Sequence, residues 1–444
     1  YYNRGNCLKN IKKFDESINS FNKAIKIKPD HIQAYNNLGN IYIEIKKLDS
    51  AIQNFDKAIQ INPNSAETYY NRGNALIELK KFEFAIESFD KAIQINPNYA
   101  EAYKNRANLL VDLKKIEEAF QSYNKAIQIK PNLDYLLGEL FFVKNILCDW
   151  SLYNENSKKL ENEIIESKKP TMPFSTLSMF NSLFLQKICA EIFLKNKYSR
   201  ISPINKIEEK YFNKKIRVGY YSPDFRNHPV SQLLIKMLEL HDKSKFEIIG
   251  FSFGSNKEDE LRKKISTTFD QFIDVDLKSD RQIAQISRDL KIDIAIDLTG
   301  FTKDNRFGIY LERCAPIQVS YLGYSGTTGS NNIDYIIGDK VLIPDKNKKF
   351  FSEKIIYLPN TFMVNDFTKK ISKKIFSKEE LGLPKEGFVF CSFNDYYKIT
   401  PVIFNIWMKL LKKVKNSVLW LAEGNNIAIS NLQREANQRG VDSN

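Results

Sequence analysis

The stretch SPDFRNHPVSQLL, residues 222–234, holds His228, one of three histidines in 444 residues. An apolar run precedes it and Pro229 follows, which predicts a strand, a short turn and a helix whose first residue is Pro229. His228 then stands at the helix cap, where the positive helix end disfavours imidazolium. A neutral imidazole there can accept a proton or a hydrogen bond near neutral pH. The alternative is a capping or ligand-orienting role. His31 and His241 have no such setting and are interpreted as structural.

A second candidate is the turn GYSGTTGS, residues 323–330, which combines glycines with hydroxyl side chains. Glycines let backbone N–H groups approach a ligand closely, as in anion-binding loops. A Gly/Thr loop is weak evidence when taken alone.

Paired asparagines form a third pattern. One member recurs at Asn3, Asn37, Asn71 and Asn105, and the other at Asn6, Asn40, Asn74 and Asn108. Residues three apart share one helix face, and a carboxamide both donates and accepts, so it can pair with an extended peptide backbone. We therefore expect a peptide-binding groove formed by Asn37, Asn40, Asn71, Asn74, Asn105 and Asn108. A solvated face in an Asn-rich protein is the alternative.

The asparagines belong to a 34-residue period, which also carries Pro29, Pro63, Pro97 and Pro131. Within residues 32–65 the pattern of small and large residues is that of a tetratricopeptide repeat, with two antiparallel helices ended by proline. Residues 1–133 are thus predicted to hold four repeats, the first incomplete at its start. The period stops afterwards, and residues 134–210 are interpreted as a helical bridge without visible chemistry.

Residues 211–370 alternate between short apolar strands and helices, which is typical of a parallel α/β sheet. The expected strands are 216–222, 246–254, 293–300, 317–323 and 334–339, and the expected helices are 229–241, 258–269 and 279–290. Ligands of such sheets bind at the carboxyl ends of the strands. His228, the loop after Gly300 and residues 323–330 are therefore expected to converge.

A second α/β region occupies residues 371–444, with strands at 387–394 and 417–423 and helices at about 400–414 and 427–439. It is shorter than the roughly 100 residues or more of a usual domain. The chain also begins at Tyr1, inside a repeat. We expect it to be truncated at both ends, and the last strand to have an unpaired edge.

Several long motifs carry a resemblance: IRVGYYSPDFRNHPVSQLL, DIAIDLTGFTKDNR, APIQVSYLGYSGTTGSNNIDYII and FCSFNDYYKITP. Together with the repeats they resemble the protein O-GlcNAc transferase / SPINDLY family, closest to its bacterial branch. The resemblance implies an α plus α/β fold, with a repeat superhelix followed by a Rossmann-like GT-B glycosyltransferase lobe and an incomplete second lobe. It also implies inverting transfer of a sugar, usually from UDP-N-acetylglucosamine, to Ser or Thr of proteins.

The resemblance assigns roles to particular residues. His228 matches a cleft histidine, and Lys398 matches the lysine that meets the donor diphosphate. Donor contacts are implied for Tyr324, Gly326, Thr327, Thr328, Gly329, Asn394 and Asp395. Asp395 departs from the Asn or Gln that the family prefers, and a carboxylate near a diphosphate would repel it. No metal or other cofactor is expected.

Composition narrows the class of partner and the cellular compartment. The net charge is +14, but the lysines are dispersed, so a nucleic-acid partner is disfavoured and an acidic nucleotide sugar fits better. Five scattered cysteines without a CxxC pair indicate reduced thiols in a cytoplasmic protein. No apolar run reaches the ~18 residues of a membrane span.

Two other functions stay open at this point. O-fucosyl or other glycosyl transfer would use the same fold, and a non-catalytic repeat scaffold would use the groove alone. Residues 1–444 by themselves are expected to bind peptide without transferring sugar.

Overall fold

The structure, a computed structural model, describes residues 1–199, 204, 207, 211–254 and 259–443. These residues form two units. The repeat unit consists of residues 1–156 together with residues 386–444, and the sheet unit consists of residues 157–385. The bridge expected for residues 134–210 belongs partly to each unit, because the boundary after residue 156 falls inside a helix. Most of the last eleven residues of the bridge lie outside the described part. Each unit is considered by itself below.

The repeats are helix pairs, as the 34-residue period predicts. Small residues allow the two helices of a pair to approach: a Cβ added to Gly39 would lie 2.5 Å from the Phe55 ring, and Gly73 meets Phe89 in the same way. The pairs are α1 (Tyr2–Asn10) with α2 (Phe14–Ile27), α3 (Ile32–Glu44) with α4 (Leu48–Ile61), α5 (Ala66–Glu78) with α6 (Phe82–Ile95), and α7 (Ala100–Asp112) with α8 (Ile116–Ile129).

The turn inside each pair holds a lysine in the left-handed region. The φ angles of Lys12, Lys46, Lys80 and Lys114 are 58°, 59°, 59° and 60°. A non-glycine residue in this region costs about 1 kcal/mol or more. The same strained position thus recurs in all four repeats.

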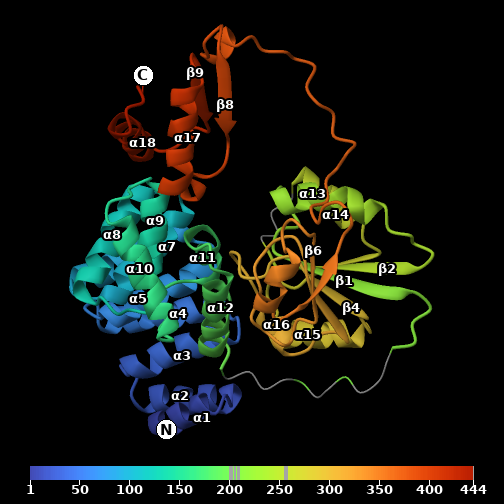
Figure 1. The fold of residues 1–444 in the computed structure, drawn as a ribbon. Helices are drawn as coiled ribbons and strands as arrows, with labels where there is room; N and C mark the ends of the chain where they lie inside the picture. The colour runs from blue at the N-terminus through green and yellow to red at the C-terminus, as the bar shows by residue number, and fades with distance from the viewer. Residues whose placement is uncertain (200–203, 205–206, 208–210, 255–258, 444) are drawn as a thin grey trace. The chain divides into compact units, whose positions relative to one another are not determined.

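The first helices of successive repeats pack on one another: α3 contacts α5, and α5 contacts α7. Such packing places the first helices on the inner side of the curved array, which runs from the blue to the cyan helices in Figure 1. The paired asparagines therefore lie on the inner side. The next helix, α9 (Leu136–Ile146), extends this row because it contacts α7.

Residues 386–444 pack against α9 and the turn that follows it. Trp150, Phe404 and Leu432 belong to one buried cluster there, and the Asn431 amide donates to the Leu147 carbonyl at 2.8 Å. The elements are β8 (Phe388–Ser392), η3 (Tyr396–Lys398), α17 (Pro401–Lys413), β9 (Ser417–Leu421) and α18 (Asn426–Gln438). Among the described residues β9 pairs with β8 alone, so its other edge is unpaired, as expected.

The sheet unit holds seven parallel strands in the order β3-β2-β1-β4-β5-β6-β7. Its core contains Val218, Leu234, Ile248 and Val319. The strands are β1 (Ile216–Ser222), β2 (Phe246–Ser252), β3 (Gln271–Asp274), β4 (Ile294–Asp297), β5 (Ile317–Ser320), β6 (Tyr335–Gly338) and β7 (Lys354–Tyr357). The five expected strands are confirmed, whereas the four-residue strands β3 and β7 were not expected.

Helices cover both faces of this sheet (Figure 1), which confirms the expected α plus α/β class. On one face lie α13 (Pro229–Glu239) and α14 (Glu260–Ser266), and on the other α15 (Asp280–Asp289) and α16 (Gly308–Leu311). The expected start of α14, residue 258, lies outside the described residues. The other helices of the chain are α10 (Tyr153–Ile165), α11 (Pro173–Met179) and α12 (Leu183–Lys197), with 3-10 turns η1 (Asp345–Phe350) and η2 (Glu379–Leu381).

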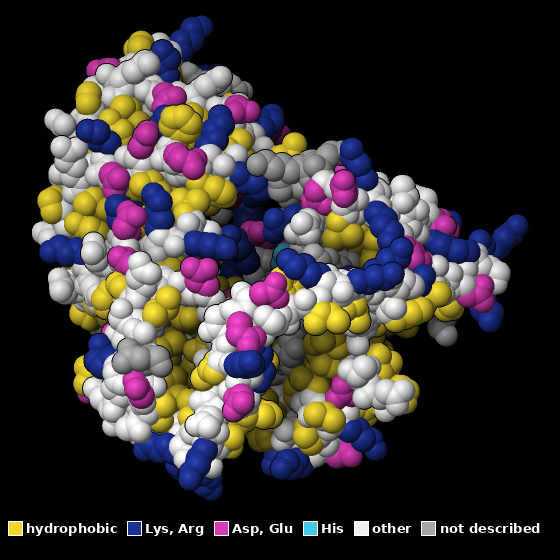
Figure 2. All heavy atoms as spheres, turned by 90° about the horizontal axis from the view of Figure 1, so that it is seen from above, with side chains coloured by type: hydrophobic (Ala, Val, Ile, Leu, Met, Phe, Trp, Pro, Cys, Tyr) yellow, Lys and Arg dark blue, Asp and Glu magenta, His cyan; other side chains and the backbone are white. Residues whose placement is uncertain are grey.

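The surface matches two expectations from composition. On the face drawn in Figure 2, Lys and Arg side chains are interspersed with Asp and Glu instead of forming one block. In the part of the chain that the structure describes, every helix is too short or too polar to cross a membrane.

Candidate functional site

The strand order of the sheet unit reverses between β1 and β4. The chain runs outward from β1 to β2 and β3, then returns to β4 on the other side of β1. Tyr221 pairs with Asp297, and Asp297 pairs with Ser320, so β1, β4 and β5 end at one edge. Loops at such a reversal point diverge and leave a crevice in which α/β proteins bind ligands. The three loops expected to converge do leave the sheet at this edge.

His228 stands in the first of these loops, as the N-cap of α13. Its Nδ1 atom accepts the Val230 N–H at 3.3 Å and lies 3.6 Å from an Asp224 carboxylate oxygen. Partial burial lowers the pKa of His228, with Asp224 opposing that shift and Arg226 adding to it. The ring is therefore neutral near pH 7. Because Nδ1 accepts a hydrogen bond, the proton of the neutral ring belongs on Nε2.

The capping geometry thus bears on the two roles left open for His228. An imidazole with its proton on Nε2 offers a hydrogen-bond donor from that atom, not a base. A base at Nε2 would need the Nδ1 proton to turn toward Asp224 instead. The observed geometry favours the ligand-orienting role.

The loop GYSGTTGS follows β5, but its hydroxyl groups face inward. The Thr327 hydroxyl donates to the Glu353 carboxylate at 2.7 Å, and the Thr328 N–H donates to it at 2.6 Å. The Thr328 hydroxyl also donates to Glu353. Thr327 and Thr328 are buried, so these side chains hold the loop together, and the donor contacts implied for them remain a prediction. Glu353 was not expected.

Glycine is required at two places around this loop. Gly329 has a φ of +67°, and a Cβ there would meet Glu191 of α12 at 3.0 Å. Gly326 lies against the Tyr324 ring, where a Cβ would be 2.8 Å from the hydroxyl oxygen. Both therefore serve close packing, and the ligand contacts implied for them remain a prediction.

Tyr324 and the loop after β4 pack together at the carboxyl ends of the strands. Gly300, with a φ of +57°, leaves room for Tyr324, since a Cβ there would lie 2.3 Å from the tyrosine Cβ. The hydroxyls of Tyr324 and Thr299 are buried and have no hydrogen-bond partner among the described residues. Buried hydroxyls are normally satisfied, so these two atoms are candidates for meeting a ligand or a water molecule.

Asp297 anchors the same loop. Its carboxylate accepts the N–H groups of Thr299, at 2.9 Å, and Gly300, at 3.1 Å. Burial raises the pKa of Asp297 to about 6, although these hydrogen bonds oppose the rise. Its position in DIAIDLTG, at the end of an apolar strand, is the signal that could have singled it out.

Lys398, Asn394 and Asp395 belong to the repeat unit, in the loop between β8 and α17. All three are exposed. The Lys398 N–H donates to the Asp395 carbonyl at 3.0 Å, and the Lys398 ammonium lies 5.7 Å from the centre of the Tyr397 ring. At the end of a parallel strand, in front of a helix N-terminus, this loop is suited to meet an anion.

Helix α9 brings the repeats to this loop. The rings of Phe142 and Tyr397 lie 4.9 Å apart, in a tilted arrangement. Phe142 follows Asn108 by 34 residues and so continues one row of paired positions. The asparagine face and the Lys398 loop are therefore neighbours within one unit, a relation that sequence reasoning missed.

The asparagines form rungs that join consecutive repeats. The Asn37 amide donates to Asn6 at 2.9 Å and to the Tyr2 hydroxyl at 3.3 Å. The Asn105 amide donates to Asn74 at 2.9 Å and to the Tyr70 hydroxyl at 3.0 Å. Asn108 accepts the Tyr123 hydroxyl, while Asn40 and Asn71 make no side-chain hydrogen bond among the described residues. Some asparagines of the row are therefore hydrogen-bonded within the repeats, and others are available to a peptide.

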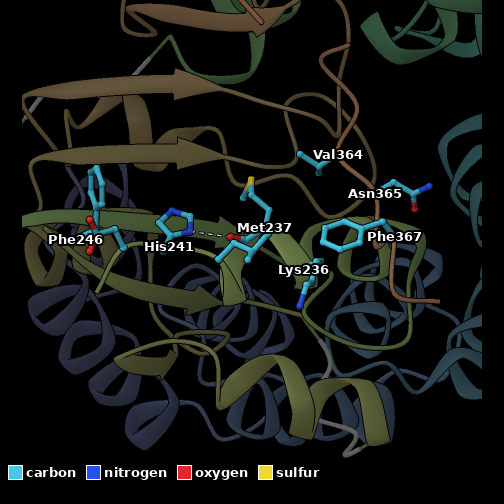
Figure 3. Close-up of a pocket in the computed structure, with 9 residues that line it drawn as sticks. Lys236, Met237, His241, Phe246, Val364, Asn365 and Phe367 are labelled. Carbon is cyan, nitrogen blue, oxygen red and sulfur yellow. Dashed lines mark hydrogen bonds between the residues drawn. The ribbon is translucent and has the colours of Figure 1, made fainter. Parts of the chain in front are cut away.

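A pocket of about 450 Å³ lies elsewhere in the sheet unit, between the end of α13 and residues 364–367. Figure 3 shows His241 beside it, with its Nδ1 atom bonded to the Met237 carbonyl at 2.9 Å. The other ring nitrogen lies 3.0 Å from the Tyr220 hydroxyl. With both nitrogens engaged, His241 is structural. The pocket lies at the far end of α13 from His228, roughly 16 Å along the helix.

Comparison with known proteins covers both units. The profile of glycosyl transferase family 41 matches residues 147–378 and 371–444. Tetratricopeptide profiles match residues 1–31, 66–99 and 100–133. The repeats expected from the 34-residue period are thereby confirmed.

Named relatives match parts of the chain. It is 38% identical over 213 residues to a probable UDP-N-acetylglucosamine–peptide N-acetylglucosaminyltransferase, SEC, of Arabidopsis thaliana, covering 47% of this chain and 22% of that protein. It is 27% identical over 430 residues to the UDP-N-acetylglucosamine–peptide N-acetylglucosaminyltransferase of Caenorhabditis elegans, covering 67% and 37%. The chain thus spans well under half the length of these relatives.

A solved structure shares the fold. A point mutant of the Thermobaculum terrenum O-GlcNAc transferase superposes with a TM-score of 0.60 at 21% identity, over 93% of this chain and 72% of that one.

Proposed function

Because the chain belongs to glycosyl transferase family 41, we propose that the protein transfers N-acetylglucosamine from UDP-N-acetylglucosamine to Ser or Thr side chains of polypeptides bound by its repeats. One observation carries the proposal beyond family membership. The inner asparagine face and the loop that holds Lys398 are joined within one unit through Phe142 and Tyr397. A polypeptide lying along the repeats is therefore led toward the loop that we assign to the donor diphosphate.

Two loops supply the chemistry. The acceptor hydroxyl oxygen bonds to the anomeric carbon as the bond from that carbon to UDP breaks. The hydroxyl proton passes to a phosphate oxygen of the donor, and negative charge grows on the leaving diphosphate. The exposed Lys398 ammonium stabilises that charge more in the transition state than in the ground state. His228, at the reversal point of the sheet, donates from Nε2 and orients the donor. The proposal requires no metal ion.

The experiment uses the full-length protein with a long protein acceptor and either UDP-N-acetylglucosamine or a GDP-fucose donor. We expect transfer from the first donor only, followed by mass spectrometry of Ser and Thr residues. The variant in which Asn37, Asn40, Asn71 and Asn74 are all replaced by Ala should transfer less to the protein acceptor, with little change in hydrolysis of the donor. Each lost amide pair is worth about 0.5–1.5 kcal/mol, so the four changes are made together.

The matched control replaces Asn22 and Asn124 with Ala. Both lie on second helices, α2 and α8, away from the inner face. They should leave transfer and hydrolysis unchanged. Equal loss of both activities in the fourfold variant would remove the groove from the proposal, and transfer from GDP-fucose alone would favour the fucosyl alternative.

Asp395 supplies a prediction about donor affinity. The side chain is exposed three residues before Lys398, where its negative charge repels a diphosphate. Asp395→Asn removes the charge and keeps the shape, so the KM for UDP-N-acetylglucosamine should fall about fivefold, as about 1 kcal/mol of repulsion implies. The fall should shrink in high salt, which screens exposed charges. Initial-rate kinetics at two ionic strengths measure it, and a KM that stays the same or rises would show that the carboxylate does not face the diphosphate.

A further inference from the structure

The rungs of the asparagine face follow one rule. In each of the two rungs described above, an amide at position i donates to the asparagine at i−31 and to the tyrosine at i−35. Asn37 and Asn105, two repeats apart, both obey it. Both have a tyrosine at i−35. The intervening position, Asn71, has Asn36 there instead and makes no such bond among the described residues.

The period continues by one step into α9, where the side chain changes. Adding 34 to Asn105 gives Glu139. Its positions i−31 and i−35 are Asn108 and Lys104. Helix α9, which carries Glu139, contacts α7, which carries Lys104, and the Lys104 charge lowers the pKa of the Glu139 carboxyl. The row of amide rungs therefore ends in a carboxyl rung, and α9 is part of the row.

The Glu139 carboxyl has no hydrogen-bond partner among the described residues, although it is partly buried. The Lys104 ammonium does not pair with it. Instead, this ammonium donates to the Asp134 carbonyl at 2.7 Å and lies 5.7 Å from the centre of the Tyr135 ring. A partly buried carboxyl without a partner is costly, and a cation from a ligand would satisfy it best.

The groups around Glu139 are of mixed charge. On α7 lie Lys104 and Asp112, and on α8 the Tyr123 hydroxyl. Asp134, on the connecting turn, adjoins Lys104. One helical turn further along α9, Phe142 contacts Tyr397 of η3, which Asp395 precedes and Lys398 ends. Burial raises the pKa of Glu139 to about 7, with Lys104 opposing the rise and Asp112 adding to it.

We propose that Glu139 is a specificity-determining residue that selects acceptor polypeptides carrying an Arg or Lys side chain next to the segment that enters the Lys398 loop. The inference rests on the proposed function, since it names the class of acceptor that the same groove prefers. The carboxylate binds the cationic side chain, while the amide rungs bind the backbone without regard to sequence. Glu139 thereby turns a general peptide groove into one with a charge preference at its catalytic end.

The test measures binding to the full-length protein by fluorescence anisotropy. The probes are fluorescein-labelled Gly/Ser/Thr peptides in which one Arg is moved one position at a time, each with a citrulline counterpart that has the same shape and no charge. At one position Arg should bind about tenfold more tightly than citrulline, a typical value for a charge-assisted hydrogen bond in a partly buried site. The advantage should grow between about pH 6 and pH 8, as the carboxyl ionises.

Two variants separate the explanations. Glu139→Gln restores a neutral amide rung, so the advantage of Arg should disappear while citrulline peptides bind as before. Glu67→Gln, at an exposed carboxyl in the first turn of α5, should keep the advantage. If peptides bind but Arg and citrulline are equivalent everywhere, or if the advantage survives Glu139→Gln, the inference is overturned. If no peptide binds at all, the groove itself, and with it the proposed function, fails.

Discussion

Replacing Lys398 with Ala is expected to lower kcat by about 10²- to 10³-fold, the usual cost of removing one fixed group that stabilises transition-state charge. The KM for UDP-N-acetylglucosamine should change less, because the diphosphate carries its additional charge only as the sugar departs. The Lys398 side chain is exposed and its ammonium makes no ion pair among the described residues. Its removal therefore leaves no buried partner behind, and the variant should fold normally.

Steady-state kinetics with a saturating acceptor measure this loss. Lys409→Ala is the matched control, since Lys409 is an exposed lysine on the adjacent helix α17. It removes the same charge without touching the loop and should leave kcat unchanged. A variant at Lys398 with wild-type kcat would show that the diphosphate binds elsewhere.

Replacing His228 is the second large effect. His228→Ala removes both the cap on the Val230 N–H and the Nε2–H donor, so kcat/KM should fall by about 10²-fold, the cost of a lost hydrogen bond to a charged group together with the disturbed cap. His228→Asn is the informative variant. Its side-chain oxygen can cap the helix and its amide can donate, but it cannot accept a proton. We expect His228→Asn to recover most of the loss.

The two variants separate the roles left open by the sequence. A general base contributes about 10²- to 10⁴-fold to kcat, and Asn cannot replace it. If His228→Asn is as inactive as His228→Ala, with the loss in kcat, the ring is a base and its Nδ1 proton turns to Asp224 in the working complex. If both variants retain wild-type kinetics, His228 lies outside the site. Circular dichroism of each variant checks that α13 is intact.

Much of the fold could be predicted because its signals are local and periodic. The 34-residue period determines the repeats, and the apolar run IRVGYYS marks β1 at the residues observed. The strands β3 and β7 are the two edges of the sheet, and none of their residues is buried, so neither has the buried apolar run that marks the inner strands. The cap at His228 could be predicted because Pro229 makes the helix start visible in the sequence.

The site was less predictable because its contacts join distant segments. Glu353 meets Thr328 across 25 residues of chain, and no spacing rule links a glutamate before an edge strand to a Gly/Thr loop. Residues 134–156 lose the proline and alanine pattern, so they were interpreted as a bridge without chemistry. The register nevertheless continues into α9, and counting 34 residues from Asn105 and Asn108 would have identified Glu139 and Phe142.

The left-handed lysine at the turn of every repeat bears on how such a protein changes over time. Asn or Gly would relieve the strain, yet Lys12, Lys46, Lys80 and Lys114 all retain it. A shared local disadvantage indicates that the repeats descend from one another by duplication of the whole unit. Because each copy meets its neighbours through the same contacts, a unit can be gained or lost without redesigning an interface. The length of polypeptide that the groove spans is then set by the number of repeats. The preference of the groove for a cationic side chain is set by one codon, that of Glu139.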